Sequence, residues 1–165
     1  MAITAISEGQ YAQAFPNFGA ERRGAPVVAF FRISQEPITT RNMIYKPDMV
    51  VVLDPSILRL VNVSAGLHEQ GILVTNSRFS GEELQQELGI NQSIASVDAN
   101  CIAREELGLP ITNTTMLGAI LRAREIFSPE KLLDPLKERF GRIAAKNIGA
   151  MERAYRETTI APACN

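Results

Sequence analysis

A repeated alternation between short apolar runs and amphipathic segments, over residues 49–107, is the feature that most constrains the fold of this chain. The apolar runs have the length and β-branched content of buried strands, and they are residues 49–53, 71–75 and 93–97. Segments with helical signals follow them at residues 56–60, 80–89 and 99–107. Because the crossover between two parallel strands passes over one face of the sheet, this order predicts an α/β fold in three layers: a mostly parallel sheet with helices on both faces.

The segments on either side of this region have other patterns. Near the amino end we predict a short helical stretch, a loop and a buried strand, at residues 2–8, 9–25 and 27–33. The C-terminal third is predicted to be helical, at residues 114–127, 129–140 and 142–156. The tail, residues 159–165, is expected to be loosely held. Since the chain has 165 residues, 45% of them hydrophobic, we expect a single domain over residues 1–165.

Polar residues mark where several of these elements begin or end. Ser80 and Glu83 have the spacing of a capping box, and Ser56 can cap the short helix that follows it. Asp54 and Asp98 both come directly after strands, where acids often bind ligands in α/β folds. An ordinary turn is the simpler interpretation of Asp54-Pro55.

Composition excludes several kinds of function. The formal net charge of -1 gives little driving force for binding nucleic acid or an anionic membrane. Cys101, Cys164 and the single histidine, His68, do not have the spacing of a zinc or iron–sulfur site. No phosphate-binding glycine motif or nucleophile elbow is found, so we predict no catalytic residue and no metal ligand. No apolar run reaches the ~18–20 residues of a membrane span, and we expect a cytoplasmic protein.

The segment over residues 11–27 is unusually long for a connection inside an α/β domain. It contains Phe15 and Phe18, while its prolines limit backbone freedom and Gly19 and Gly24 permit close approach of another chain. These properties predict a shaped binding loop rather than a passive link.

Two adjacent arginines, Arg22 and Arg23, lie within that segment. In an extended backbone their side chains point to opposite sides, so they cannot both grip one carboxylate. In one interpretation, one guanidinium anchors the loop, for example to Glu21, and the other reaches an anionic ligand or a partner subunit. In the other, both are solvated surface charges, and the sequence leaves both interpretations open.

A second segment that suits binding is the helix start at Asn113, Thr114 and Thr115. Unpaired backbone N–H groups and the helix dipole favour a phosphate or carboxylate there. The alternative is that Asn113 or Thr114 is simply the N-cap of the helix.

Both segments, and others, resemble one protein family. The matching runs are Tyr11-Ala12-Gln13-Ala14-Phe15-Pro16, Phe18-Gly19, Glu21-Arg22-Arg23-Gly24-Ala25-Pro26-Val27, Val97-Asp98-Ala99, Asn113-Thr114-Thr115-Met116-Leu117-Gly118-Ala119 and Lys146-Asn147-Ile148. Over essentially its whole length the chain resembles the gamma subunits of 2-oxoacid:ferredoxin oxidoreductases, in particular those of pyruvate synthase.

The resemblance implies a multisubunit enzyme that converts pyruvate, coenzyme A (CoA) and oxidised ferredoxin to acetyl-CoA, carbon dioxide and reduced ferredoxin. Thiamine diphosphate, Mg²⁺ and iron–sulfur clusters would belong to alpha, beta and ferredoxin-like delta subunits, and this chain alone would bind no cofactor. Its expected role is assembly and the positioning of CoA. The partner interface would include Phe15, Phe18, Gly19, Glu21, Arg22, Arg23 and Gly24, and the CoA contacts would be Asn113, Thr114 and Thr115.

One departure and two alternatives accompany this resemblance. Family members usually begin with a strand and a Gly-rich turn ahead of the Tyr11 segment, and this sequence has neither, so we expect the natural reading frame to begin upstream of Met1. The substrate could instead be 2-oxoisovalerate, phenylglyoxylate or 2-oxoglutarate, although the run over residues 21–26 favours pyruvate or branched-chain types. A freestanding nucleotide- or flavin-binding module is a second alternative, against which the missing phosphate-binding motif argues.

Overall fold

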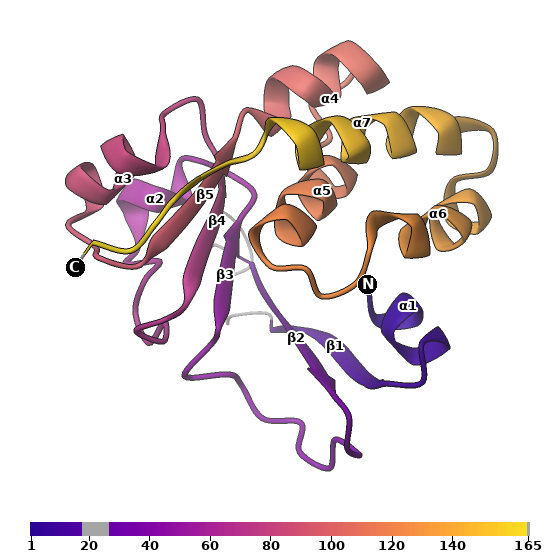
Figure 1. Cartoon of the computed structure of the whole chain (residues 1–165), viewed down its shortest axis with the longest axis horizontal. Coiled ribbons are helices and arrows are strands. Elements are labelled where there is room, and N and C mark those ends of the chain that lie inside the picture. Colours follow the sequence, from indigo (N-terminus) through magenta and orange to yellow (C-terminus); the bar gives the residue numbers. More distant parts are fainter. Residues whose placement is uncertain (18–26, 165) are drawn as a thin grey trace. The chain divides into compact units, whose positions relative to one another are not determined.

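The computed structural model describes residues 1–17 and 27–164 (Figure 1). These residues fall into two compact units, Met1–Ile44 and Tyr45–Asn165. The expectation of a single domain over the whole chain stays a prediction.

The first unit contains a helix, α1 (Ala2–Ser7), and two strands, β1 (Tyr11–Asn17) and β2 (Val28–Ser34). The strands pair antiparallel in a register that joins Tyr11 to Ser34 and Asn17 to Val28. The prediction of a loop over residues 9–25 is therefore wrong for Tyr11–Asn17, which form β1. This strand depends on a distant partner rather than on its own pattern, and it tolerates Pro16 because both strands of a two-stranded sheet are edges.

The second unit is built on a four-stranded sheet in the order β3 (Met49–Val52), β4 (Ile72–Asn76), β5 (Ser93–Val97) and β6 (Thr159–Ala161). The first three strands are parallel, and β6 pairs antiparallel with β5. The prediction of a mostly parallel sheet is confirmed, whereas the prediction of a loosely held tail is wrong for residues 159–161, which form β6. Beyond β6, the side chain of Gln85, which is buried, donates to the backbone oxygen of Pro162 at 2.8 Å and so ties the tail to a helix.

Helices cover both faces of this sheet, as predicted (Figure 1). On one face, α2 (Ile57–Leu60) and α3 (Gly81–Leu88) pack with the strands around Val52, Leu58, Leu67, Leu73, Leu84 and Ile94. On the other, α4 (Ala99–Leu107), α5 (Asn113–Ala123) and α7 (Ala144–Glu157) contribute to a core of Ile72, Val74, Ala95, Val97, Ala99, Ile102, Met116, Ala119, Ala150 and Ala154. Successive residues of β4 and β5 alternate between these two cores, which is the two-residue period of a strand buried on both faces.

The helical C-terminal third is also confirmed, with different boundaries. Helix α5 ends at Ala123, because Arg124 has an extended backbone. Two short 3₁₀ helices, η1 (Pro129–Leu132) and η2 (Gly141–Ile143), precede α6 (Leu133–Phe140) and α7. Within the described residues no helix is both long enough and apolar enough to cross a membrane.

Candidate functional site

The connections that follow β4 and β5 leave the carboxyl ends of these neighbouring strands toward opposite faces of the sheet. After β4 the chain enters α3 on one face, and after β5 it enters α4 on the other. A crevice at such a point is the usual ligand site of an open α/β sheet. A cleft of about 670 Å³ is found here, and it is lined by Pro55, Ser56, Leu58, Arg59, Asn76, Ser77, Arg78, Phe79, Leu84, Glu87, Leu88, Asp98, Asn100, Cys101, Arg104 and Glu105.

Asn76 joins the segments that meet at this cleft. It is the last residue of β4 and is 2% exposed. Its side-chain Nδ2 donates to the backbone oxygen of Leu53 at 2.9 Å, and its Oδ1 accepts from the backbone N–H of Asn100 at 3.3 Å. One buried amide therefore ties the segment after β3 and the start of α4 to the end of β4.

Side chains of the chain itself cap the helices that begin beside the cleft. At α3 the predicted capping box is confirmed, since the backbone N–H of Ser80 donates to Glu83 Oε2 at 2.7 Å and that of Glu83 donates to Ser80 Oγ at 3.2 Å. At α4, Asp98 Oδ1 accepts from the backbone N–H of Cys101 at 2.9 Å. At α2 the predicted Ser56 cap is wrong, because the Ser56 side chain caps nothing and Asp54 Oδ1 instead accepts from its backbone N–H at 2.9 Å.

The positive charge available at the cleft comes from arginines. Arg59 Nε is paired with Glu87 Oε1 at 2.8 Å. Arg78, after β4, and Arg104, in α4, are exposed, and neither side chain has a hydrogen bond or ion pair with another described residue. Two guanidinium groups thus face the cleft region without a carboxylate partner in the described part of the chain.

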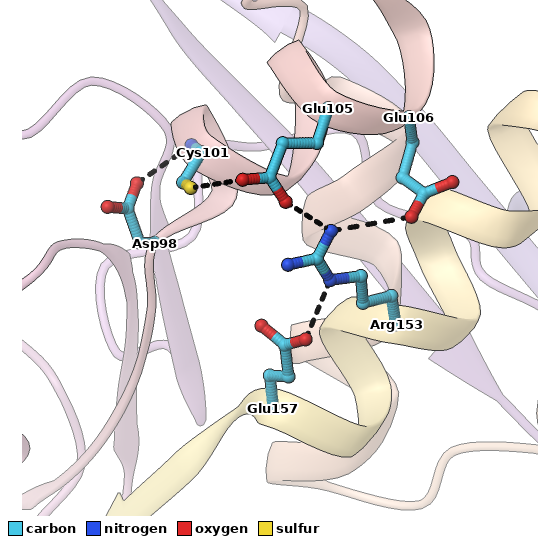
Figure 2. A network of polar contacts seen from close by, with 6 residues as sticks. All are labelled: Asp98, Cys101, Glu105, Glu106, Arg153 and Glu157. Carbon is cyan, nitrogen blue, oxygen red and sulfur yellow. Dashed lines mark hydrogen bonds and ion pairs between the residues drawn. The ribbon is translucent and has the colours of Figure 1, made fainter.

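One wall of the cleft is held by a polar network that begins on α7 (Figure 2). Arg153 Nη1 lies 2.5 Å from Glu105 Oε2 and 3.4 Å from Glu106 Oε1, and Arg153 Nε lies 2.6 Å from Glu157 Oε1. Glu105 Oε1 in turn accepts from the Cys101 thiol at 3.4 Å. The network connects α7 to α4 and fixes the Glu105 carboxylate beside Cys101.

These contacts make Cys101 a poor nucleophile. Hydrogen bonding to Arg153 lowers the pKa of Glu105, so that its carboxylate stays ionised. The hydrogen bond to this carboxylate, followed by its negative charge, raises the pKa of the Cys101 thiol. Because the thiolate is the reactive form, the start of α4 does not activate this cysteine as helix starts often do.

Replacing Glu105 by glutamine is expected to speed alkylation of Cys101 at neutral pH by roughly two- to tenfold, because the thiol pKa falls when the carboxylate is removed. The rate would be measured with iodoacetamide in a Cys164→Ser background, since Cys164 is the other exposed cysteine. Glu106→Gln is the control, because Glu106 contacts Arg153 and makes no bond to Cys101. Equal rates in the two variants would contradict this account.

The predicted interface residues lie largely outside the described residues, namely Phe18, Gly19, Glu21, Arg22, Arg23 and Gly24. Phe15, in β1, is half-buried, and its ring centroid lies 5.4 Å from that of Phe30. The guanidinium of Arg32 lies 5.9 Å from the Phe15 ring centroid. The described part of this segment is therefore an ordered hairpin.

The predicted anion contacts lie at the start of α5, and none of them lines the cleft. Asn113 is exposed, whereas Thr114 and Thr115 are 2% and 0% exposed. The N-cap is Thr112, without a side-chain bond, so the interpretation of Asn113 or Thr114 as N-cap is wrong. Asn113 Oδ1 instead accepts from the backbone N–H of Thr114 at 2.8 Å.

Sequence reasoning missed most of the cleft. It singled out Asp98, which lines the cleft and caps α4, and it correctly interpreted Asp54-Pro55 as a turn. Asn76, Arg78, Phe79 and Arg104 were not singled out. Their position just after the ends of β4 and β5 is a signal that the sequence contains. Within residues 1–17 and 27–164, no group of three histidine, cysteine or acidic side chains is placed to hold a metal ion.

Comparisons with known proteins agree along nearly the whole chain. Residues 1–157 match the family described as pyruvate ferredoxin/flavodoxin oxidoreductase. The chain is 48% identical over 162 residues to the pyruvate/ketoisovalerate oxidoreductases common subunit gamma of Pyrococcus furiosus, covering 97% of this chain and 88% of that protein. It is 45% identical over 158 residues to pyruvate synthase subunit PorC of Methanothermobacter marburgensis, covering 94% and 85%.

A solved structure agrees with these matches. The crystal structure of pyruvate oxidoreductase subunit PORC from Thermotoga maritima superposes with a TM-score of 0.84 at 36% identity, covering 97% of this chain and 86% of that one. The chain therefore belongs to the pyruvate ferredoxin/flavodoxin oxidoreductase family and is one of its gamma subunits.

Proposed function

We propose that this chain is the gamma subunit of a cytoplasmic, thiamine diphosphate-dependent enzyme that converts pyruvate, CoA and oxidised ferredoxin to acetyl-CoA, carbon dioxide and reduced ferredoxin. The observation that carries the proposal is similarity to named gamma and PorC subunits over more than nine-tenths of the chain. In this proposal the thiamine diphosphate, Mg²⁺ and iron–sulfur clusters are bound by alpha, beta and delta subunits. This chain assembles with them and positions CoA.

The first unit supports the assembly role. Neither strand of its hairpin contains a fully buried residue, and a two-stranded hairpin is marginal in water without further packing. Tyr11, Val27 and Val28 leave 47%, 69% and 47% of their surface exposed. We assign the partner contact to this hairpin and to residues 18–24, with the contact residues Phe15, Phe18, Gly19, Glu21, Arg22, Arg23 and Gly24.

We also propose that CoA contacts the start of α5, but with fewer of the predicted side chains. Because Thr114 and Thr115 are buried, the group that would meet an anion there is the exposed Asn113. Backbone N–H groups of the first turn would assist it, apart from that of Thr114, which already donates to Asn113 Oδ1. A helix start of this kind supplies attraction for a phosphate and performs no bond-breaking step.

Reversing the charge of Arg23 tests the docking role. In co-expression with the alpha, beta and delta subunits, Arg23→Glu is expected to lower the amount of this chain in the purified complex at least tenfold, because it places a carboxylate at the proposed interface. Stoichiometry would be read from the denatured complex, and the apparent KM for CoA from the fraction that assembles. Arg156→Glu, on the exposed side of α7, is the matched control. Assembly and turnover equal to wild type would refute the docking role.

A second substrate has a specific observation in its favour. The Pyrococcus furiosus relative is named as a subunit common to pyruvate and ketoisovalerate oxidoreductases. The reconstituted complex would be assayed with pyruvate and with 2-oxoisovalerate, using CoA and ferredoxin in both assays. The result shows whether this chain serves one oxidoreductase or is shared by two with different partner subunits. Turnover of 2-oxoglutarate or phenylglyoxylate alone would overturn the assignment to pyruvate.

A further inference from the structure

We propose that the cleft at the ends of β4 and β5 binds a ligand with an aromatic ring and a diphosphate group, with Arg78 and Arg104 holding the phosphates and Phe79 packing against the ring. The site differs from the start of α5, whose three predicted contacts do not line it. Its volume of about 670 Å³ falls within the roughly 300–1,000 Å³ typical of small-molecule sites.

The charges at the cleft favour an anion. Each acidic side chain of the lining is already engaged: Glu87 with Arg59, Asp98 with the backbone of Cys101, and Glu105 with Arg153. The side chains of Arg78 and Arg104 have no partner among the described residues, and they come from two different segments that line the cleft, the β4–α3 connection and α4. Two guanidinium groups that line one cleft favour a ligand with more than one phosphate, because each can donate two parallel N–H bonds.

The helix starts at the cleft explain why arginines would carry this contact. In many nucleotide sites the backbone N–H groups of a helix start hold the phosphate. Here Ser80 and Glu83 cap α3, and Asp98 places a carboxylate at the start of α4. A phosphate at either end would meet an acidic side chain, so the free arginines are the attractive groups.

Phe79 supplies the apolar part of the site. It follows Arg78 directly, lines the cleft and leaves 52% of its surface exposed, although it is a large apolar side chain. Asn76 and Ser77, which also line the cleft, are buried and hydrogen-bonded, so this part of the lining is already fixed. A flat ring that covers Phe79 would remove its exposed apolar surface from water, and aromatic contact of this kind favours offset or edge-to-face stacking.

This ligand chemistry has two sources: a free nucleoside diphosphate, or the nucleotide portion of CoA. Only the second source rests on the proposed function. Binding of ADP to the isolated full chain is independent of subunit assembly, so its failure and the failure of the proposed function are separate results.

The test is calorimetric titration of the full chain with ADP, CoA, pyrophosphate and succinate. ADP is expected to bind, and Arg78→Gln or Arg104→Gln is expected to weaken its binding at least tenfold. Arg156→Gln, an exposed arginine of α7 outside the cleft, is expected to leave the affinity unchanged. Phe79→Ala is expected to weaken ADP binding several-fold and to leave pyrophosphate binding unchanged.

The possible results distinguish a free nucleotide from CoA as the ligand, and they show when the proposal is wrong. Equal affinity for ADP and CoA supports a site that recognises only the nucleotide portion. Tighter binding of CoA than of ADP supports CoA as the natural ligand. Absence of ADP and CoA binding at millimolar concentration, equal binding of succinate and ADP, or wild-type affinity in both arginine variants would overturn the proposal. If an Arg→Gln variant does not fold, as judged by circular dichroism, Arg→Lys replaces it, because lysine keeps the charge and loses the two-bond geometry.

Discussion

Alanine at position 118 is expected to destabilise the second unit by about 3 kcal/mol or more, because α5 and α7 touch through their backbones at this glycine. A Cβ added to Gly118 would lie 2.0 Å from the backbone oxygen of Met151 and 2.7 Å from the backbone nitrogen of Tyr155. Neither atom is the end of a flexible side chain, so the helices must separate. The helix propensity of alanine offsets only about 1 kcal/mol of this cost.

The measurement is thermal unfolding followed by circular dichroism, with a fall in Tm of roughly 10 °C expected, at about 3 °C for each kcal/mol. Gly149→Ala is the matched control, since it is the same change in a neighbouring helix and its added Cβ would meet only Glu106 Oε2 at 3.5 Å. This control is expected to be neutral or to raise Tm slightly. Equal melting of the two variants would show that the close crossing of α5 and α7 is not required.

The contact at Gly118 also bears on the cleft. Helix α7 carries Arg153, which holds Glu105 of α4 at the cleft wall (Figure 2). Moving α7 away from α5 therefore moves the group that fixes Glu105 and, through it, the Cys101 thiol. A packing change on one side of the sheet is expected to alter the geometry of the proposed ligand site.

The parts of the fold that could be predicted are those whose signal is local. The three parallel strands and the helices after them have their own periodicity and end signals, such as the Ser80–Glu83 capping box. The local sequence is therefore enough to predict them. Strands β1 and β6 were missed because their partners are distant in the sequence. β1 pairs with β2, which begins at Val28, and β6 pairs with β5 from the far end of the chain.

The cleft was missed for a related reason. The sequence predicts helices on both faces of the sheet, but it does not show that α3 and α4 lie on different faces. That choice follows from the packing of α4 with α5 and α7 and from the return of β6. Only then do Arg78 and Arg104 become neighbours of one crevice rather than two surface arginines.

Alanine at position 76 is expected to be the most damaging polar change at the cleft. The Asn76 amide satisfies two backbone groups of other segments, the Leu53 oxygen and the Asn100 N–H. Leaving a buried polar group without its partner costs about 1–3 kcal/mol, so we expect a loss of roughly 2–3 kcal/mol and a fall in Tm of about 6–9 °C.

The control is Asn91→Ala, because Asn91 is exposed between α3 and β5 and contributes its backbone oxygen to the bond with Cys164. Its Tm is expected to stay within about 2 °C of wild type. Hydrogen exchange gives a second readout, since loss of the Asn76 amide should speed exchange of the Asn100 N–H more than that of buried β4 amides such as Val74. If Asn76→Ala melts with the control and the Asn100 amide stays protected, the start of α4 is held by its Asp98 cap and its packing alone.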